Sequence, residues 1–103
     1  MKKLLLIFIT LFSLTATVQA EDATNGIWID VRTVAEYQQG HKSGAINIPH
    51  TTIGQRIQAI TTDREATIHL YCGTGFRAGI AKATLQQMGY SNVINEGGLS
   101  DVQ

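Results

Sequence analysis

The sequence has 103 residues, with eight lysines and arginines, eight aspartates and glutamates, and a single cysteine. This length suits one small domain, and the balanced charge excludes the strongly basic surface of nucleic-acid-binding proteins, so we expect no nucleic-acid partner. A lone cysteine excludes both an internal disulfide and a CxxC dithiol site.

Residues 1–20 have the pattern of a secretory signal peptide. Two lysines give a basic start, residues 4–18 are mostly apolar, and small residues suited to cleavage end at Ala20. A retained membrane anchor is the alternative, but it favours about 20 uninterrupted apolar residues. Four hydroxyl residues interrupt this stretch: Thr10, Ser13, Thr15 and Thr17. We therefore predict cleavage after Ala20, one domain over residues 21–103, a periplasmic location and no stable membrane association.

The first half of this domain predicts short strands and helices in alternation. Residues 27–31 are β-branched and aromatic, which is typical of a strand. Thr33 and Glu36 have capping-box spacing, which predicts a short helix that ends at Gly40. Residues 45–48 predict a second strand, closed by a proline.

The second half continues the alternation. Thr52 repeats the capping-box spacing, and a helix with one buried stripe is predicted from three isoleucines at helical spacing: Ile53, Ile57 and Ile60. After a turn over residues 61–66, a strand is predicted at 67–71, a helix at 77–88 that Gly89 caps, a last strand at 91–95 and then a short tail. Strands that alternate with helices predict an α/β fold with a central parallel sheet and helices on both faces. Ligands of such folds bind beyond the carboxyl ends of the strands.

The segment 70–78 contains the features of an anion site with a nucleophile. An apolar strand leads to Cys72, two glycines at alternate positions let backbone N–H groups converge on the sulfur, and a helix begins near Arg77. These groups favour the thiolate of Cys72 over the thiol, whose ordinary pKa is about 8.5. The alternative is a buried structural cysteine beside a strand-to-helix turn.

Several short motifs follow one another along the domain. In chain order they are Asp30-Val31-Arg32, Glu36-Tyr37, Gly40-His41, Gly44-Ala45-Ile46-Asn47-Ile48-Pro49, Tyr71-Cys72-Gly73-Thr74-Gly75-Phe76-Arg77, Met88-Gly89-Tyr90 and Glu96-Gly97-Gly98-Leu99. Together they span nearly the whole of residues 21–103, and this ordered set resembles the single-domain rhodaneses.

The resemblance implies a rhodanese-like domain over residues 21–103 with sulfurtransferase activity. In this family a thiolate attacks a sulfane donor such as thiosulfate, keeps the outer sulfur as a persulfide and passes it to an acceptor such as cyanide or a thiol. Carried over by position, Cys72 is the expected catalytic residue. The expected substrate-binding residues are Gly73, Thr74, Gly75, Phe76 and Arg77, of which the last would hold the anionic donor. We expect a monomer with small-molecule partners, no cofactor and no metal.

Two departures from the common family pattern concern the donor. Gly73 stands where a basic residue is frequent, and Ala78 stands where a serine or threonine is frequent. The predicted site therefore has less positive charge and one hydroxyl fewer than many relatives.

Two other functions stay open at this point. A phosphatase or arsenate reductase also combines a cysteine loop with an arginine at a helix start, but it needs five residues between the two, and here four separate Cys72 from Arg77. A non-catalytic module that carries persulfide sulfur, or binds sulfur anions, would need the same Cys72.

Other prominent residues have structural interpretations. Asp30 and Arg32 are expected to form a partly buried charge pair, and Trp28 is expected in the core. Phe76 would either form an apolar rim of the site or pack on its neighbours. The histidines lack metal-ligand spacing and are expected to be hydrogen-bonded or at the surface: His41, His50 and His69.

Overall fold

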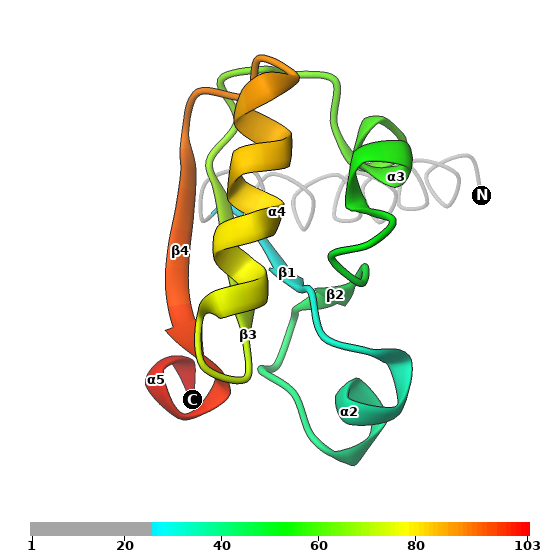
Figure 1. The fold of residues 1–103 in the computed structure, drawn as a ribbon, viewed down its shortest axis with the longest axis vertical. Coiled ribbons are helices and arrows are strands. Elements are labelled where there is room, and N and C mark those ends of the chain that lie inside the picture. The colour runs from blue at the N-terminus through cyan, green and yellow to red at the C-terminus, as the bar shows by residue number, and fades with distance from the viewer. Residues whose placement is uncertain (1–25) are drawn as a thin grey trace, which may run out of the picture.

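The computed structural model describes residues 26–103, which form a parallel sheet with helices packed on it (Figure 1). The strands are β1 (Ile27–Asp30), β2 (Ile46–Asn47), β3 (Ile68–Cys72) and β4 (Val93–Gly98), in the spatial order β2-β1-β3-β4. All neighbouring strands are parallel, an arrangement that needs long crossover connections, usually helices. The predicted signal peptide lies outside the described residues.

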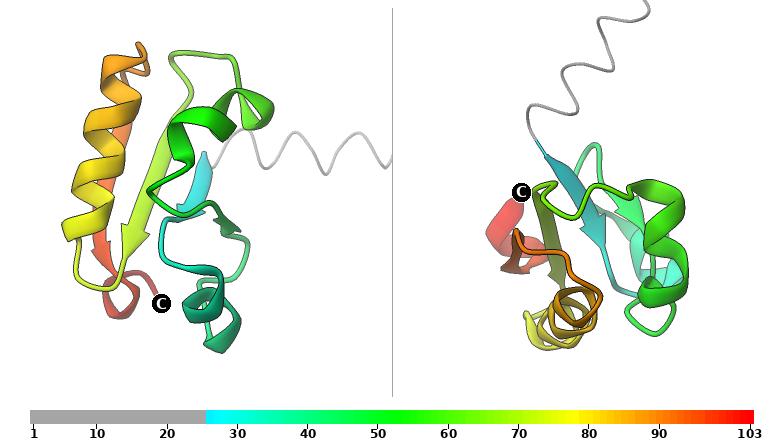
Figure 2. Two further views of the ribbon diagram at one scale, coloured as in Figure 1. Left: turned by 45° about the vertical axis from the view of Figure 1, so that its right-hand side comes forward. Right: turned by 90° about the horizontal axis from the view of Figure 1, so that it is seen from above.

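The helices of the described region are α2 (Val34–Gln39), α3 (Ile53–Ile60), α4 (Phe76–Gln87) and α5 (Leu99–Val102). Helices α3 and α4 pack together on one face of the sheet, whereas α5 lies on the other side, at the carboxyl end (Figure 2). Helix α2 lies at the same end of the sheet. The predicted α/β class with a parallel sheet is confirmed, although the helices cover the two faces unequally. Within residues 26–103, no helix is long and apolar enough to cross a membrane.

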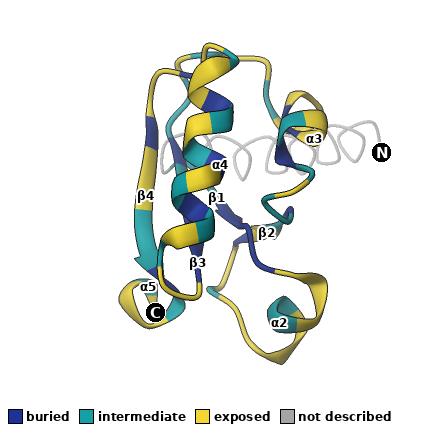
Figure 3. Ribbon diagram, in the orientation of Figure 1, coloured by how far each residue is buried: buried dark blue, intermediate teal, exposed yellow. Residues whose placement is uncertain are grey.

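The core lies between the sheet and the α3–α4 layer (Figure 3). Strand residues Ile29 and Leu70 meet helix residues Ile57 and Leu85 there, and all four side chains are fully buried. Each such burial stabilises the fold by roughly 1.5–3 kcal/mol. The predicted stripe of α3 is confirmed except at Ile60, which ends the helix and is 36% exposed.

The opposite face of the sheet carries aromatic and charged side chains. Because side chains alternate along a strand, Trp28 and His69 point away from the core, and their rings stack with centroids 4.3 Å apart. The Lys42 ammonium lies 4.6 Å from the Trp28 ring centroid. Trp28 is only partly buried and lies outside the core cluster. The prediction that it belongs to the core was therefore wrong.

The two predicted capping boxes have different outcomes. At α2, the Thr33 hydroxyl accepts a hydrogen bond from the Glu36 N–H (3.2 Å), and the Glu36 carboxylate accepts one from the Thr33 N–H (3.0 Å). At α3, Thr52 makes no side-chain cap. Its hydroxyl donates to the carbonyl of Pro49 instead (3.3 Å), so the second capping box was wrong.

Strand β4 extends further than its sequence indicates. It was expected to end at Asn95, but it runs through Gly97 to Gly98, opposite Cys72 of β3. The following residues, expected as a short tail, form α5. This extension places two glycines, Gly97 and Gly98, next to the Cys72 loop.

Candidate active site

Cys72 ends β3, and the loop after it leads directly into α4. Its sulfur accepts hydrogen bonds from the backbone N–H groups of Gly75 (2.9 Å) and Ala78 (3.4 Å). Gly75 has a φ of 103°, a left-handed conformation that favours glycine. The loop thereby curls back, and the first turn of α4 points its free N–H groups at the sulfur.

The electrostatics of the loop favour the thiolate. Burial raises the pKa of the Cys72 thiol, whose residue is only 1% exposed. Backbone N–H groups outweigh this effect, so the pKa lies below its ordinary value. In order of importance these groups belong to Ala78, Gly75, Thr74 and Arg77. The site can therefore hold a sulfur anion at the start of a helix.

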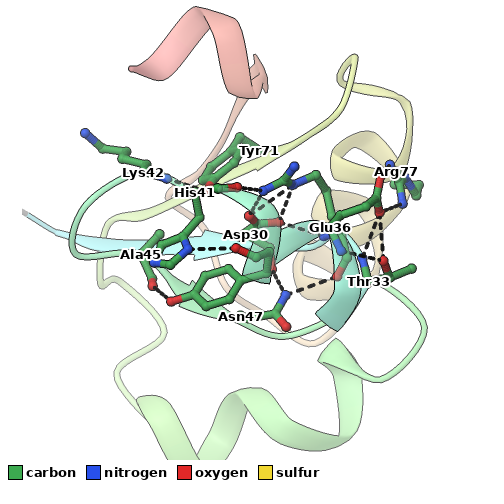
Figure 4. A network of polar contacts seen from close by, with 12 residues as sticks. Asp30, Thr33, Glu36, His41, Lys42, Ala45, Asn47, Tyr71 and Arg77 are labelled. Atoms are coloured by element: carbon green, nitrogen blue, oxygen red, sulfur yellow. Dashed lines mark hydrogen bonds and ion pairs between the residues drawn. The ribbon is translucent and has the colours of Figure 1, made fainter.

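Arg77 is not a free cation in this structure. Its two terminal nitrogens donate to the two carboxylate oxygens of Glu36, at 2.8 and 3.1 Å (Figure 4). The Arg77 guanidinium and the Thr33 N–H lower the pKa of Glu36 to about 2. The hydrogen bonds to Glu36 in turn raise the pKa of Arg77. This bidentate contact joins α2 to the first turn of α4.

The end of β4 supports the loop from the other side. The Asn95 side-chain amide donates to the Gly75 carbonyl (3.0 Å), and its oxygen accepts from the Gly97 N–H (2.9 Å). A Cβ atom added at Gly98 would overlap the Gly73 carbonyl oxygen. Glycine at position 98 thus allows the close approach of β4 to the loop.

The chain is similar to proteins of a known family. The rhodanese-like domain family model matches residues 14–103, and thiosulfate sulfurtransferase PspE of Escherichia coli is 47% identical over 75 residues, covering 73% of this chain and 72% of that protein. This chain belongs to the rhodanese-like family.

Two further relatives support the same assignment. A sulfurtransferase of Allochromatium vinosum is 38% identical, over 72% of this chain and 67% of its own length. A solved structure of a rhodanese with anions from E. coli is 46% identical and has a TM-score of 0.71, covering 74% of this chain and 89% of that one. The resemblance to the rhodanese family and the sulfurtransferase assignment are confirmed.

The predicted loop residues of this rhodanese-like domain lie together around Cys72. Gly73 and Thr74 are exposed, and Phe76 is 75% exposed at the first position of α4. This exposure contradicts the interpretation that Phe76 packs on its neighbours. Its aromatic ring instead stands at the surface beside the loop.

Asp30 and Arg32 form the charge pair that was predicted. The Arg32 guanidinium contacts both carboxylate oxygens of Asp30, the shortest contact being 2.7 Å, and also donates to the Gly40 carbonyl (2.7 Å). Both residues are buried. The pair fixes the path of the chain around α2, which carries Glu36.

The histidines take part in local contacts. His41 contacts the Tyr37 carbonyl (2.8 Å), and its ring stacks on the Tyr37 ring. His69 pairs with Glu96 (2.7 Å). His50 is partly buried. Among residues 26–103, no group of three or more His, Cys, Asp or Glu side chains is gathered where it could hold a metal ion.

Sequence reasoning did not find two contacts of the site. From the sequence, Glu36 is predicted to be a helix cap and belongs to one of the family motifs, and Asn95 is predicted to end a strand, but neither is predicted to contact the Cys72 loop or its helix. The pairing of Glu36 with Arg77 joins residues 41 positions apart, so no local spacing could indicate it. The glycines after Asn95 were a usable signal, because consecutive glycines at a strand end often permit close backbone approach.

Proposed function

We propose that this protein transfers sulfane sulfur from thiosulfate to cyanide or a thiol through a persulfide on Cys72. The observation that carries the proposal is the position of the Cys72 sulfur, which is buried beside the start of α4 and accepts hydrogen bonds from the N–H groups of Gly75 and Ala78. The naming of the E. coli relative as a thiosulfate sulfurtransferase supports this choice of donor.

The reaction consists of two displacements on sulfur. First, the Cys72 thiolate attacks the outer sulfur of thiosulfate, the sulfur–sulfur bond of the donor breaks, and sulfite leaves with the bonding electron pair. The cysteine then holds an anionic persulfide. Next, cyanide or a thiolate attacks the terminal sulfur, thiocyanate or a new persulfide leaves, and the Cys72 thiolate returns. Backbone N–H groups stabilise the sulfur anion at both stages.

In this proposal, the Cys72 loop binds the sulfur donor. Gly73, Thr74, Gly75 and Phe76 surround the approach to the sulfur, and the N–H groups of Arg77 that do not contact Glu36 hold a donor oxygen. We further propose a monomer in the periplasm, released from residues 1–20 by cleavage, with small sulfur compounds as its partners.

Intact mass spectrometry tests the covalent step. After treatment with thiosulfate, the wild-type protein should gain one sulfur atom, and Cys72→Ser should gain none. Addition of cyanide should remove the sulfur and release thiocyanate catalytically. An unchanged mass with thiosulfate, or Cys72-dependent hydrolysis of an aryl phosphate without sulfur transfer, would overturn the proposal. A persulfide that forms but never turns over would instead identify a carrier.

A further inference from the structure

The Glu36 carboxylate is fixed in place before any donor binds. One of its oxygens accepts hydrogen bonds from the N–H and the hydroxyl of Thr33, both at 3.0 Å, and the same oxygen also accepts from Arg77. Two donors at the amino end of α2 therefore hold this carboxylate against the Arg77 guanidinium.

This contact leaves Arg77 with limited capacity for anions. A guanidinium has five N–H groups, and the bidentate contact uses one on each terminal nitrogen. An anion bound by the remaining groups lies beside the Glu36 carboxylate. Arg32, the other arginine of this region, contacts both carboxylate oxygens of Asp30 through its Nε and one terminal nitrogen. Neither arginine supplies an uncompensated charge to the Cys72 loop.

The geometry points to Glu36 as a specificity-determining residue that discriminates against doubly charged sulfur donors in favour of singly charged ones. The repulsion between Glu36 and a bound donor grows in proportion to the donor's charge. Thiosulfate carries two negative charges at neutral pH, whereas an organic thiosulfonate anion carries one and presents the same outer sulfur. With the latter, the Cys72 thiolate attacks the outer sulfur and a sulfinate leaves with the electron pair. This inference rests on the proposed role of Arg77 as the donor-binding cation.

The substitution Glu36→Gln isolates the charge from the structural role. Glutamine serves as well as glutamate at this position of a capping box, so α2 keeps its cap while the negative charge is lost. Glu65→Gln is a matched control, because Glu65 is exposed and precedes β3, whose opposite end carries Cys72.

Steady-state transfer to cyanide, at one low ionic strength, gives the Michaelis constants for thiosulfate and for methanethiosulfonate. We expect Glu36→Gln to lower the constant for thiosulfate about tenfold and that for methanethiosulfonate about threefold, because the repulsion scales with charge. Glu65→Gln should leave both constants unchanged. A purely structural effect of Glu36 would change both donors equally, and that result, or a constant for thiosulfate that does not fall, would overturn the inference.

Arg77→Ala separates this inference from the function on which it rests. If Arg77 holds the donor, its loss should raise the Michaelis constant for thiosulfate about tenfold to a hundredfold and should abolish the effect of Glu36→Gln in the double variant. A raised constant in Arg77→Ala without the expected fall in Glu36→Gln contradicts the role of Glu36 alone. An unchanged constant in Arg77→Ala contradicts the donor-binding role of Arg77, and the inference with it.

Discussion

At the scale of single residues, two opposing effects act on Cys72. Its burial disfavours a charge, whereas the N–H groups at the start of α4 favour it, and the second effect prevails. The pKa of the thiol is lowered, so the thiolate fraction at neutral pH exceeds that of a free cysteine.

Alkylation by iodoacetamide measures this directly. The pH at which the rate is half-maximal should lie below about 8.5, the pKa of a free thiol, because only the thiolate reacts. The midpoint is the relevant quantity, since burial slows the reaction at every pH. The same cysteine in urea provides the control and should have the ordinary midpoint. Coincident midpoints in folded and unfolded protein would show that the loop does not stabilise the thiolate.

At this scale, contacts between residues close together in the sequence could be predicted, whereas contacts between distant residues could not. Cys72, Gly75 and Arg77 share a strand-to-helix turn, whose glycines and helix start are local signals. The contact between Arg77 and Glu36 depends instead on how α2 lies against α4. Only the folded chain brings these two elements together.

At the scale of elements, α4 positions the site by packing its inner face on the sheet. Leu85 is fully buried on that face, whereas Ile80 of the same helix is 42% exposed. Leu85→Ala should therefore lower the free energy of unfolding by about 2–5 kcal/mol. Ile80→Ala, an equivalent change to alanine in the same helix, should change it by less than about 0.5 kcal/mol. Urea denaturation followed by circular dichroism gives both values, and equal losses would contradict the assigned orientation of α4.

The caps of the helices could be predicted wherever the residue pattern is accompanied by the backbone conformation that the cap requires. Thr33 and Glu36 cap α2 as their spacing indicates, because Thr33 is extended (φ −70°, ψ 163°). Thr52 has the same spacing but a different backbone (φ −120°, ψ 3°), so its hydroxyl cannot reach the helix amides. The length of β4 could not be predicted, because glycines disfavour strands and only pairing with β3 extends them here.

At the scale of the whole molecule, the alternation of strands and helices correctly predicted a parallel sheet. Which face each helix covers could not be read from that alternation. Trp28 illustrates the difficulty, because an aromatic residue in a strand fits either face, and its neighbours His69 and Lys42 become apparent only in the fold.

The predicted signal peptide gives an expectation for the whole chain. Expressed in a bacterium with a periplasm, the protein should be released by osmotic shock with Glu21 as its first residue, because the apolar stretch directs export and Ala20 ends a cleavage site. N-terminal sequencing provides the measurement. Phe8→Arg, which places a charge in the apolar stretch, is the control and should remain uncleaved in the cytoplasm. Recovery of the wild type only in membranes, or with Met1 retained, would contradict the prediction.

The solitary, buried cysteine determines how long a loaded molecule would persist. Cys72 is the only cysteine of the chain, so no second thiol of the same molecule can attack its persulfide and close a disulfide. In the proposed mechanism, the lifetime of the bound sulfur therefore depends on encounters with an external nucleophile and rises as that nucleophile becomes scarce. A persulfide on Cys72 would make the protein a small reservoir of sulfur, discharged only when such a nucleophile arrives.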